Sequence, residues 1–118
     1  MTLRLHGIPN CDTVKRARAW LDEQRIPYRF HDFKKEGVPE AELDKWLKSL
    51  GWDVLVNRRG TTWRRLDDDT RAAVVDVPSA RAVLLANPSL IKRPVVQWDS
   101  GRGVTAGFDA AQWQRQVV

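Results

Sequence analysis

The stretch LRLHGIPNCDTVKRARAWL, from Leu3 to Leu21, decides the fold. Its first residues alternate between apolar and polar side chains until Gly7 and Pro9 break the pattern, which is typical of a short strand. Beyond the break the period changes, and apolar residues recur at helical spacing at Val14, Ala17 and Leu21. The stretch therefore predicts a strand that passes through a turn into an amphipathic helix.

A second alternating segment, IPYRFHDF at residues 26–33, follows the expected helix directly. It places Tyr28 and Phe30 on one face and Arg29 on the other, which predicts another strand. A strand, a helix and a strand joined by such short links form a βαβ unit. The two strands are therefore expected to be parallel.

The middle of the chain is expected to be helical. Pro39 suits the first position of a helix whose apolar stripe ends at Gly51. The stretch at residues 52–70, WDVLVNRRGTTWRRLDDDT, is irregular and suggests a short helix and a loop. Another helix is expected at about residues 78–86.

The C-terminal part is expected to return to strands. Val95 begins a strand, the DSGRG segment forms a turn, and residues 104–106 come back as the antiparallel partner. Asp109 is placed to cap a last helix that buries Trp113 and Val117. The predicted order is βαβ, a helical insert, then ββα.

Composition limits the classes of protein that need to be considered. The chain has 118 residues, of which 42% are hydrophobic and 30% charged, so one domain with a real core is expected. No apolar run approaches the roughly 20 residues that cross a membrane, and the start lacks a signal peptide. A single cysteine cannot form an internal disulfide, so we expect a cytoplasmic protein.

The net charge of +5 is spread among 15 acidic residues, without a sustained basic block. This pattern is more typical of a solvated surface than of a nucleic-acid-binding face. We therefore expect no direct contact with nucleic acid.

The only cysteine, Cys11, lies at the expected start of the first helix. Unpaired backbone N–H groups and the helix dipole favour a thiolate at such a position. Lys15, one turn further on the same face, adds to this effect, and the carboxylate of Asp12 opposes it. The alternative is that Cys11 is a small buried apolar residue, which is common for a lone cysteine.

Other chemistry is less well supported by the residues present. Position 14 is Val14, so no Cys-x-x-Cys redox pair exists. Cys11, His6 and His31 lack the number and spacing of zinc ligands, and no metal is expected. His6 could act as a base near the thiol, but a strand histidine is more often structural. The six tryptophans are expected to serve packing.

Three motifs together carry a resemblance to a known family: GIPNCDT, RGTTWR and IKRP. The chain resembles the ArsC/Spx/YffB family of arsenate reductase-like proteins, and most of all its YffB branch, whose members are described as glutathione-dependent thiol reductases. The resemblance implies an α/β, thioredoxin-like fold (βαβ…ββα) with a mixed four-stranded sheet. It implies one domain at 1–118, with a core at about 1–35 and 89–118 and a helical insert at about 36–88.

The resemblance also implies roles for individual residues. Cys11 corresponds to the reactive cysteine, and Lys15 to a basic residue one turn later. Arg59 corresponds to an arginine that faces the thiol, although Arg58 is a neighbour that could be confused with it. Arg93 corresponds to the arginine before a cis proline, here Pro94, which would shape the docking edge for substrate.

Arsenate reductases of the family use a further arginine after the last hairpin. In this chain that region reads VTAGFDAA, at residues 104–111, and has no arginine. Because an oxyanion is best held by several fixed donors, this difference argues against arsenate reduction. Spx-type regulators carry a Cys-x-x-Cys switch, which Val14 excludes.

Sequence and resemblance together predict a monothiol reductase. Cys11 would be the nucleophile and would form a mixed disulfide, and Lys15, Arg59 and Arg93 would stabilise the thiolate and bind carboxylates. Glutathione is expected as the co-substrate, with no tightly bound cofactor. The alternative is a non-catalytic, Spx-like protein that docks on RNA polymerase, and arsenate reduction ranks third.

Overall fold

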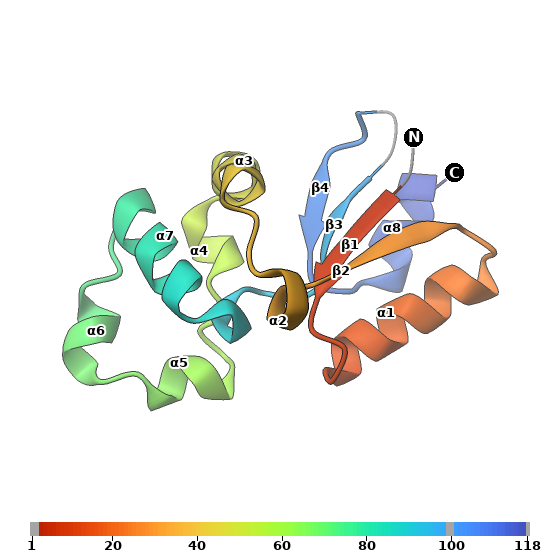
Figure 1. Cartoon of the computed structure of the whole chain (residues 1–118). Coiled ribbons are helices and arrows are strands. Elements are labelled where there is room, and N and C mark those ends of the chain that lie inside the picture. The colour runs from red at the N-terminus through yellow and green to blue at the C-terminus, as the bar shows by residue number, and fades with distance from the viewer. Residues whose placement is uncertain (1–2, 99–100, 118) are drawn as a thin grey trace. The chain divides into compact units, whose positions relative to one another are not determined.

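The computed structural model describes residues 3–98 and 101–117 (Figure 1). Contacts between Cα atoms divide the chain into two compact units. The first, which we call the sheet unit, comprises Met1–Glu36 and Arg93–Val118. The second, the helical unit, is Gly37–Lys92. Each unit has its own buried residues.

Within its described residues, the sheet unit contains four strands and three helices. The strands form one sheet in the order β2-β1-β3-β4. The elements in chain order are β1 (Leu3–Gly7), α1 (Asp12–Glu23), β2 (Tyr28–Asp32), α2 (Phe33–Glu36), β3 (Val95–Gln97), β4 (Val104–Ala106) and α8 (Ala110–Val117).

Strand pairing confirms the expected mixed sheet. β1 runs parallel to β2, with Leu5 opposite Phe30, and antiparallel to β3, with Leu5 opposite Val96. β3 and β4 are antiparallel, as expected for a returning hairpin. The predicted DSGRG turn includes Asp99 and Ser100, which lie outside the described residues.

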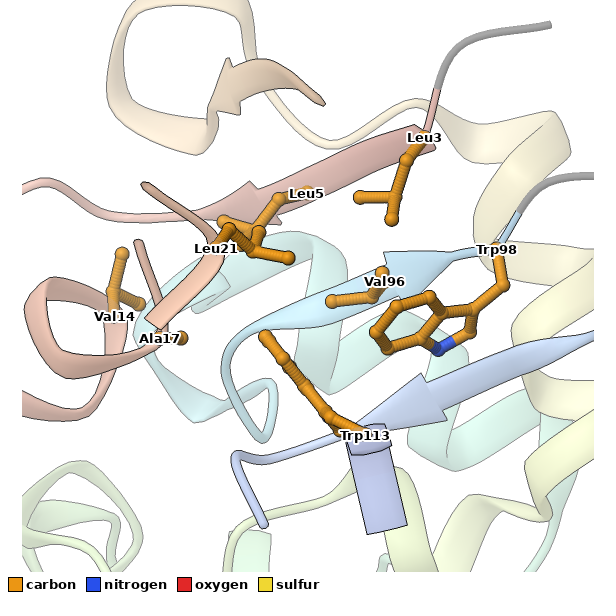
Figure 2. Close-up of a cluster of buried hydrophobic side chains, with 8 residues drawn as sticks. All are labelled: Leu3, Leu5, Val14, Ala17, Leu21, Val96, Trp98 and Trp113. Carbon is orange, nitrogen blue, oxygen red and sulfur yellow. The ribbon is translucent and has the colours of Figure 1, made fainter. Parts of the chain in front are cut away.

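One face of the sheet carries the core of this unit (Figure 2). Alternation along β1 places Leu3 and Leu5 on this face, while the neighbouring Arg4 is exposed. Helices α1 and α8 both contribute to the same cluster, so both cover this face. The cluster consists of Leu3, Leu5, Val14, Ala17, Leu21, Val96, Trp98 and Trp113.

Helix α8, which packs on this core, begins with a side-chain cap. Asp109 accepts a hydrogen bond from the backbone N–H of Gln112 at 3.2 Å, which confirms it as the cap of α8. Trp113 in that helix is fully buried, and Val117 is half-buried against the core cluster. Trp113 meets Trp98 and Phe108 edge to face, with ring centroids 5.1 and 4.8 Å apart.

Helix α1 ends in a Schellman motif whose left-handed position is taken by Arg25. The N–H of Ile26 bonds to the carbonyl of Leu21 at 2.9 Å, and the N–H of Arg25 to that of Asp22 at 3.0 Å. Arg25 has φ of 57°, where a side chain with a β-carbon is disfavoured. Glycine is the usual residue at this position.

We expect Arg25→Gly to stabilise the protein by about 0.5–1 kcal/mol, since the relief of left-handed strain exceeds the added freedom of the unfolded chain. Urea unfolding followed by circular dichroism measures this change. Arg25→Ala is the matched control, because it removes the same charge and keeps the β-carbon. Equal stabilisation by both substitutions would show that charge and not backbone conformation is responsible.

The helical unit contains five α-helices and one short 3-10 helix within residues 37–92. They are α3 (Glu40–Leu50), α4 (Trp52–Leu55), α5 (Thr61–Arg65), α6 (Asp68–Ala72), α7 (Val77–Ala86) and η1 (Pro88–Leu90). The apolar stripe predicted for α3 is buried at Leu43, Trp46 and Leu47. Arg81 of α7 joins this helix through its side-chain contacts with Asp44 and Glu40, at 2.6 and 3.1 Å.

Two expectations for this unit need correction. Pro39 is the N-cap of α3 and not its first residue, with an extended ψ of 108°. Residues 52–70 hold three short helices where one and a loop were expected, because each is too short to show a helical period. The helix expected at residues 78–86 is confirmed as α7.

Helix α7 begins with a capping box. The carboxylate of Asp76 accepts hydrogen bonds from the hydroxyl and the backbone N–H of Ser79, at 2.6 and 3.0 Å. These bonds, that of the hydroxyl first, hold the pKa of Asp76 below its ordinary value. The cap therefore stabilises the fold above the pKa of an unfolded aspartate and is lost as pH falls through the lowered value.

Candidate active site

Cys11 is the N-cap residue of α1, directly after the turn that follows β1. Its backbone is extended, with φ −143° and ψ 123°, and its side chain makes no capping hydrogen bond. The first helical bond runs from the N–H of Lys15 to the carbonyl of Cys11 at 2.9 Å. The backbone N–H groups before Lys15, in the first turn of α1, have no carbonyl of the same helix to bind. They create a partial positive charge beside the thiol.

The burial of Cys11 is intermediate. One side of the residue packs against the core cluster, so it shares some character with a small apolar residue. It is nevertheless much less buried than Val14, one turn further along the helix, which is fully covered. A thiol that is partly accessible beside a helix N-terminus is suited to react as a nucleophile.

A close approach between β1 and α1 fixes the turn that carries Cys11. A β-carbon on Gly7 would lie 2.9 Å from Cγ2 of Val14, too near for an unshifted structure. Ile8, the next residue, is buried, while Pro9 and Asn10 are exposed. The missing side chain at Gly7 thus lets the helix start close to the end of the strand.

Arg93 and Pro94 lie at the same end of the sheet as this turn. β1 finishes at Gly7 where the adjacent antiparallel β3 begins, and His6 is paired with Val95. The Arg93–Pro94 peptide bond is cis, as the resemblance implied. Pro94 is buried and Arg93 is half-buried. The strand register therefore brings Arg93, Pro94 and the turn that carries Cys11 to the same end of the strands β1 and β3.

Lys15 is exposed, on the first turns of α1. Its place in the same helix as Cys11 puts it within the sheet unit, four residues beyond the thiol. No ion pair of Lys15 occurs among the described residues, so its ammonium is available for an anion. Lys15, Cys11, Arg93 and Pro94 thus belong to one unit.

Arg59 belongs to the helical unit, in the loop between α4 and α5. Its backbone N–H donates to Oδ1 of Asn57 at 3.2 Å, and its carbonyl accepts from Arg64 at 2.8 Å. Arg59 as a whole is exposed. The neighbouring Arg58 lies over the ring of Trp52, with its Cζ 5.6 Å from the ring centroid. Arg59 is therefore held through its backbone, whereas the side chain of Arg58 is held by the Trp52 ring.

His6 has the surroundings of a structural residue. It is buried, its Nδ1 lies 3.3 Å from the carbonyl oxygen of Val95, and its ring stacks on Phe33 with centroids 6.2 Å apart. In residues 3–98 and 101–117 no cluster of three or more histidine, cysteine or acidic residues is arranged to hold a metal ion. Within the same residues, no helix is both long and apolar enough to span a bilayer.

Two residues that the sequence did not single out for a site are Asp53 and Lys92. Both line a hollow in the helical unit together with Arg58 and Arg59. Lys92 is part of the IKRP motif, but its position in the sequence does not predict that it lies close to residues 53–59. The pairing of Val56 with Ile91 brings these segments together in the fold.

A thiol at a βα junction, a cis proline before a neighbouring strand and a four-stranded mixed sheet define an arsenate reductase-like protein of thioredoxin-like fold. A profile of the ArsC family matches residues 6–116. The chain belongs to the ArsC family, whose members are arsenate reductase-like thiol oxidoreductases.

Individual relatives agree with this assignment. The chain is 41% identical over 112 residues to an uncharacterized protein of Haemophilus influenzae, covering 95% of this chain and 96% of that one. It is 28% identical to the global transcriptional regulator Spx of Listeria innocua, covering 78% and 70% of the two chains.

Two solved structures are similar over nearly their whole length. A YffB protein is 41% identical, with a TM-score of 0.91 and coverage of 99% of this chain and 100% of that chain. An arsenate reductase-related protein from Brucella melitensis is 46% identical, with a TM-score of 0.76 and coverage of 99% and 95%.

Proposed function

We propose that this protein is a monothiol, glutathione-dependent thiol oxidoreductase of the cytoplasm, with Cys11 as its nucleophile. The observation that carries the proposal is the place of Cys11, which occupies the N-cap of α1 without capping it and remains partly accessible. An N-cap residue that makes no capping hydrogen bond does not stabilise the helix in the usual way. A reactive thiol explains a cysteine at this position better than packing does. The absence of any other cysteine favours glutathione as the resolving thiol.

The reaction needs two exchange steps on a glutathionylated substrate. In the first, the Cys11 thiolate attacks the glutathione sulfur, the substrate disulfide breaks, and the substrate leaves as a thiolate that takes a proton from water. In the second, a glutathione thiolate attacks the glutathione sulfur bound to Cys11. This step releases the Cys11 thiolate and glutathione disulfide. Overall, one glutathione thiol is oxidised as the substrate sulfur is reduced, and the number of disulfide bonds stays the same.

Charged residues would support both steps. Lys15, Arg93 and the N-terminus of α1 are proposed to hold the reacting sulfur and the anionic groups of glutathione, and Arg93 can bind a carboxylate in a bidentate way. Arg59 is proposed to bind a second carboxylate of glutathione. Pro94, which is buried directly before β3, would shape the surface against which the substrate disulfide docks. No tightly bound cofactor takes part.

Reduction of a glutathionylated peptide tests the proposal directly. Purified protein with glutathione should release the free peptide faster than glutathione alone, in a ping-pong kinetic pattern that reflects the mixed disulfide with Cys11. Release at the rate of glutathione alone would reject the proposed activity.

The similarity to Spx supports a second candidate, a non-catalytic protein that binds RNA polymerase. Immobilised protein exposed to cell lysate distinguishes the two. Polymerase subunits on the resin, with no turnover of a glutathionylated peptide, would favour this binder. Turnover without polymerase would favour the reductase.

Arsenate reduction ranks third, because residues 104–111 offer no arginine. With glutathione and glutaredoxin present, we expect arsenate turnover to stay at the background rate. Arsenite formation, measured in the presence of the purified protein, checks this expectation. A rate above background that Cys11→Ser abolishes would place the protein with the arsenate reductases instead.

A further inference from the structure

A hollow of about 380 Å³ lies within the helical unit, between the loop that follows α4 and the segment that follows η1. Its two walls are joined by an antiparallel bridge between Val56 and Ile91. The N–H of Asn57 donates to Leu90 at 2.9 Å, and the N–H of Lys92 to Leu55 at 2.8 Å. The hollow is therefore set in a fixed backbone and is of the size that binds small molecules.

Three cationic side chains line this hollow: Arg58, Arg59 and Lys92. Among residues 3–98 and 101–117, none of the three forms an ion pair with a carboxylate. Arg58 rests on the Trp52 ring, which orients its guanidinium without neutralising it. Other basic residues of the unit, such as Arg71 and Arg81, are by contrast paired with carboxylates. This concentration of unpaired charge favours an anionic group in the hollow.

One acidic side chain, Asp53, lines the same hollow. Asp53 also lacks an ion-pair partner in the described part of the chain, although cations share its pocket. Val54 and Val56 contribute apolar surface beside it. A hollow in which a carboxylate and several cations are not paired with one another suits a ligand that carries both a positive and a negative group. It suits a simple anion less well, because Asp53 would repel the anion.

We propose that this hollow binds the zwitterionic α-amino-acid end of a small peptide, with Asp53 on the ammonium group and Arg58, Arg59 and Lys92 on the carboxylate. Given the function proposed above, on which this step rests, the ligand is the γ-glutamyl end of glutathione, which carries a free α-amino and a free α-carboxylate group. Arginine pairs such a carboxylate in a bidentate way, and the valines accept the intervening methylene groups.

The test uses S-methylglutathione, which has no thiol and measures binding without chemistry. Calorimetric titration of the full chain should detect binding, and Asp53→Asn and Lys92→Ala should each weaken it about three- to tenfold. An analogue that lacks the α-amino group should bind more weakly to the wild type, and Asp53→Asn should weaken it no further. Asp69→Asn and Lys48→Ala, which change exposed charges outside the hollow, should leave the affinity unchanged.

The inference is overturned if S-methylglutathione does not bind, if the two pocket variants bind it as the wild type does, or if the analogue without the amino group binds equally well. Inorganic sulfate that competes fully with S-methylglutathione would overturn it too, because the pocket would then be a general anion site. Turnover of a glutathionylated peptide is measured separately. Normal turnover with no effect of Asp53→Asn would reject the zwitterion site and leave the reductase proposal standing, whereas absent turnover would reject the reductase.

Discussion

Replacing Trp113 with alanine is expected to lower the free energy of unfolding by about 3–5 kcal/mol. Trp113 is fully buried where α8 meets the sheet, and its ring lies edge to face with Trp20, Trp98 and Phe108. Its Nε1 makes no hydrogen bond to any described residue, so the expected loss comes from packing and the cavity that remains.

Urea unfolding followed by far-ultraviolet circular dichroism measures the effect of Trp113→Ala without relying on tryptophan fluorescence. Gln114→Ala, an exposed neighbour on α8, is the matched control and should change stability by less than about 0.5 kcal/mol. A loss below about 1.5 kcal/mol for Trp113→Ala would mean that α8 contributes little to the core of the sheet unit.

Replacing Cys11 with serine should have two opposite effects. Turnover of a glutathionylated substrate should fall about a thousandfold or more, to the uncatalysed rate, because an unactivated hydroxyl is a poor nucleophile. Stability should rise by about 0.5–1 kcal/mol, since serine at an N-cap accepts the backbone bond that Cys11 leaves unmade. A residue that costs stability and supplies activity is typical of a functional site.

Thermal unfolding and peptide reduction, measured on the same preparation, separate this account from the packing alternative. If Cys11 were a buried apolar residue, Cys11→Ser would lower stability and leave turnover unchanged. Cys11→Ala is the control, because it removes the thiol without providing a cap and should lose activity with no gain in stability. A stable and active Cys11→Ser variant would contradict the proposed role of the thiol.

Periodicity predicted the first part of the sheet unit well, because β1, α1 and β2 each alternate or repeat over five residues or more. The strand at Leu3–Gly7, the helix at Asp12–Glu23 and the parallel pairing of the first two strands agree with expectation. The second strand is shorter than expected, since it spans Tyr28–Asp32 and Phe33 begins helix α2. The left-handed Arg25 could not be anticipated, because the residue that usually marks such a helix end is glycine.

The helical unit was harder to predict for two physical reasons. Its helices α4, α5 and α6 span four or five residues each, less than two turns, so no stripe distinguishes them from loops. The hollow that joins Asp53 with Lys92 depends on one long-range bridge, which no local pattern encodes. The role of Lys15 was inferred from its helical spacing and from the resemblance, and it remains a prediction. The roles of Arg59, Arg93 and Pro94 came from the resemblance and also remain predictions.

The central claim is that Cys11 forms a mixed disulfide that glutathione resolves, and intact-protein mass spectrometry tests it most directly. Protein incubated with glutathione disulfide should gain the mass of one glutathionyl group, lose it again when reduced glutathione is added, and gain nothing when Cys11 is replaced by serine. A wild-type chain that gains no glutathionyl group, or one that reduced glutathione cannot release, would contradict the account.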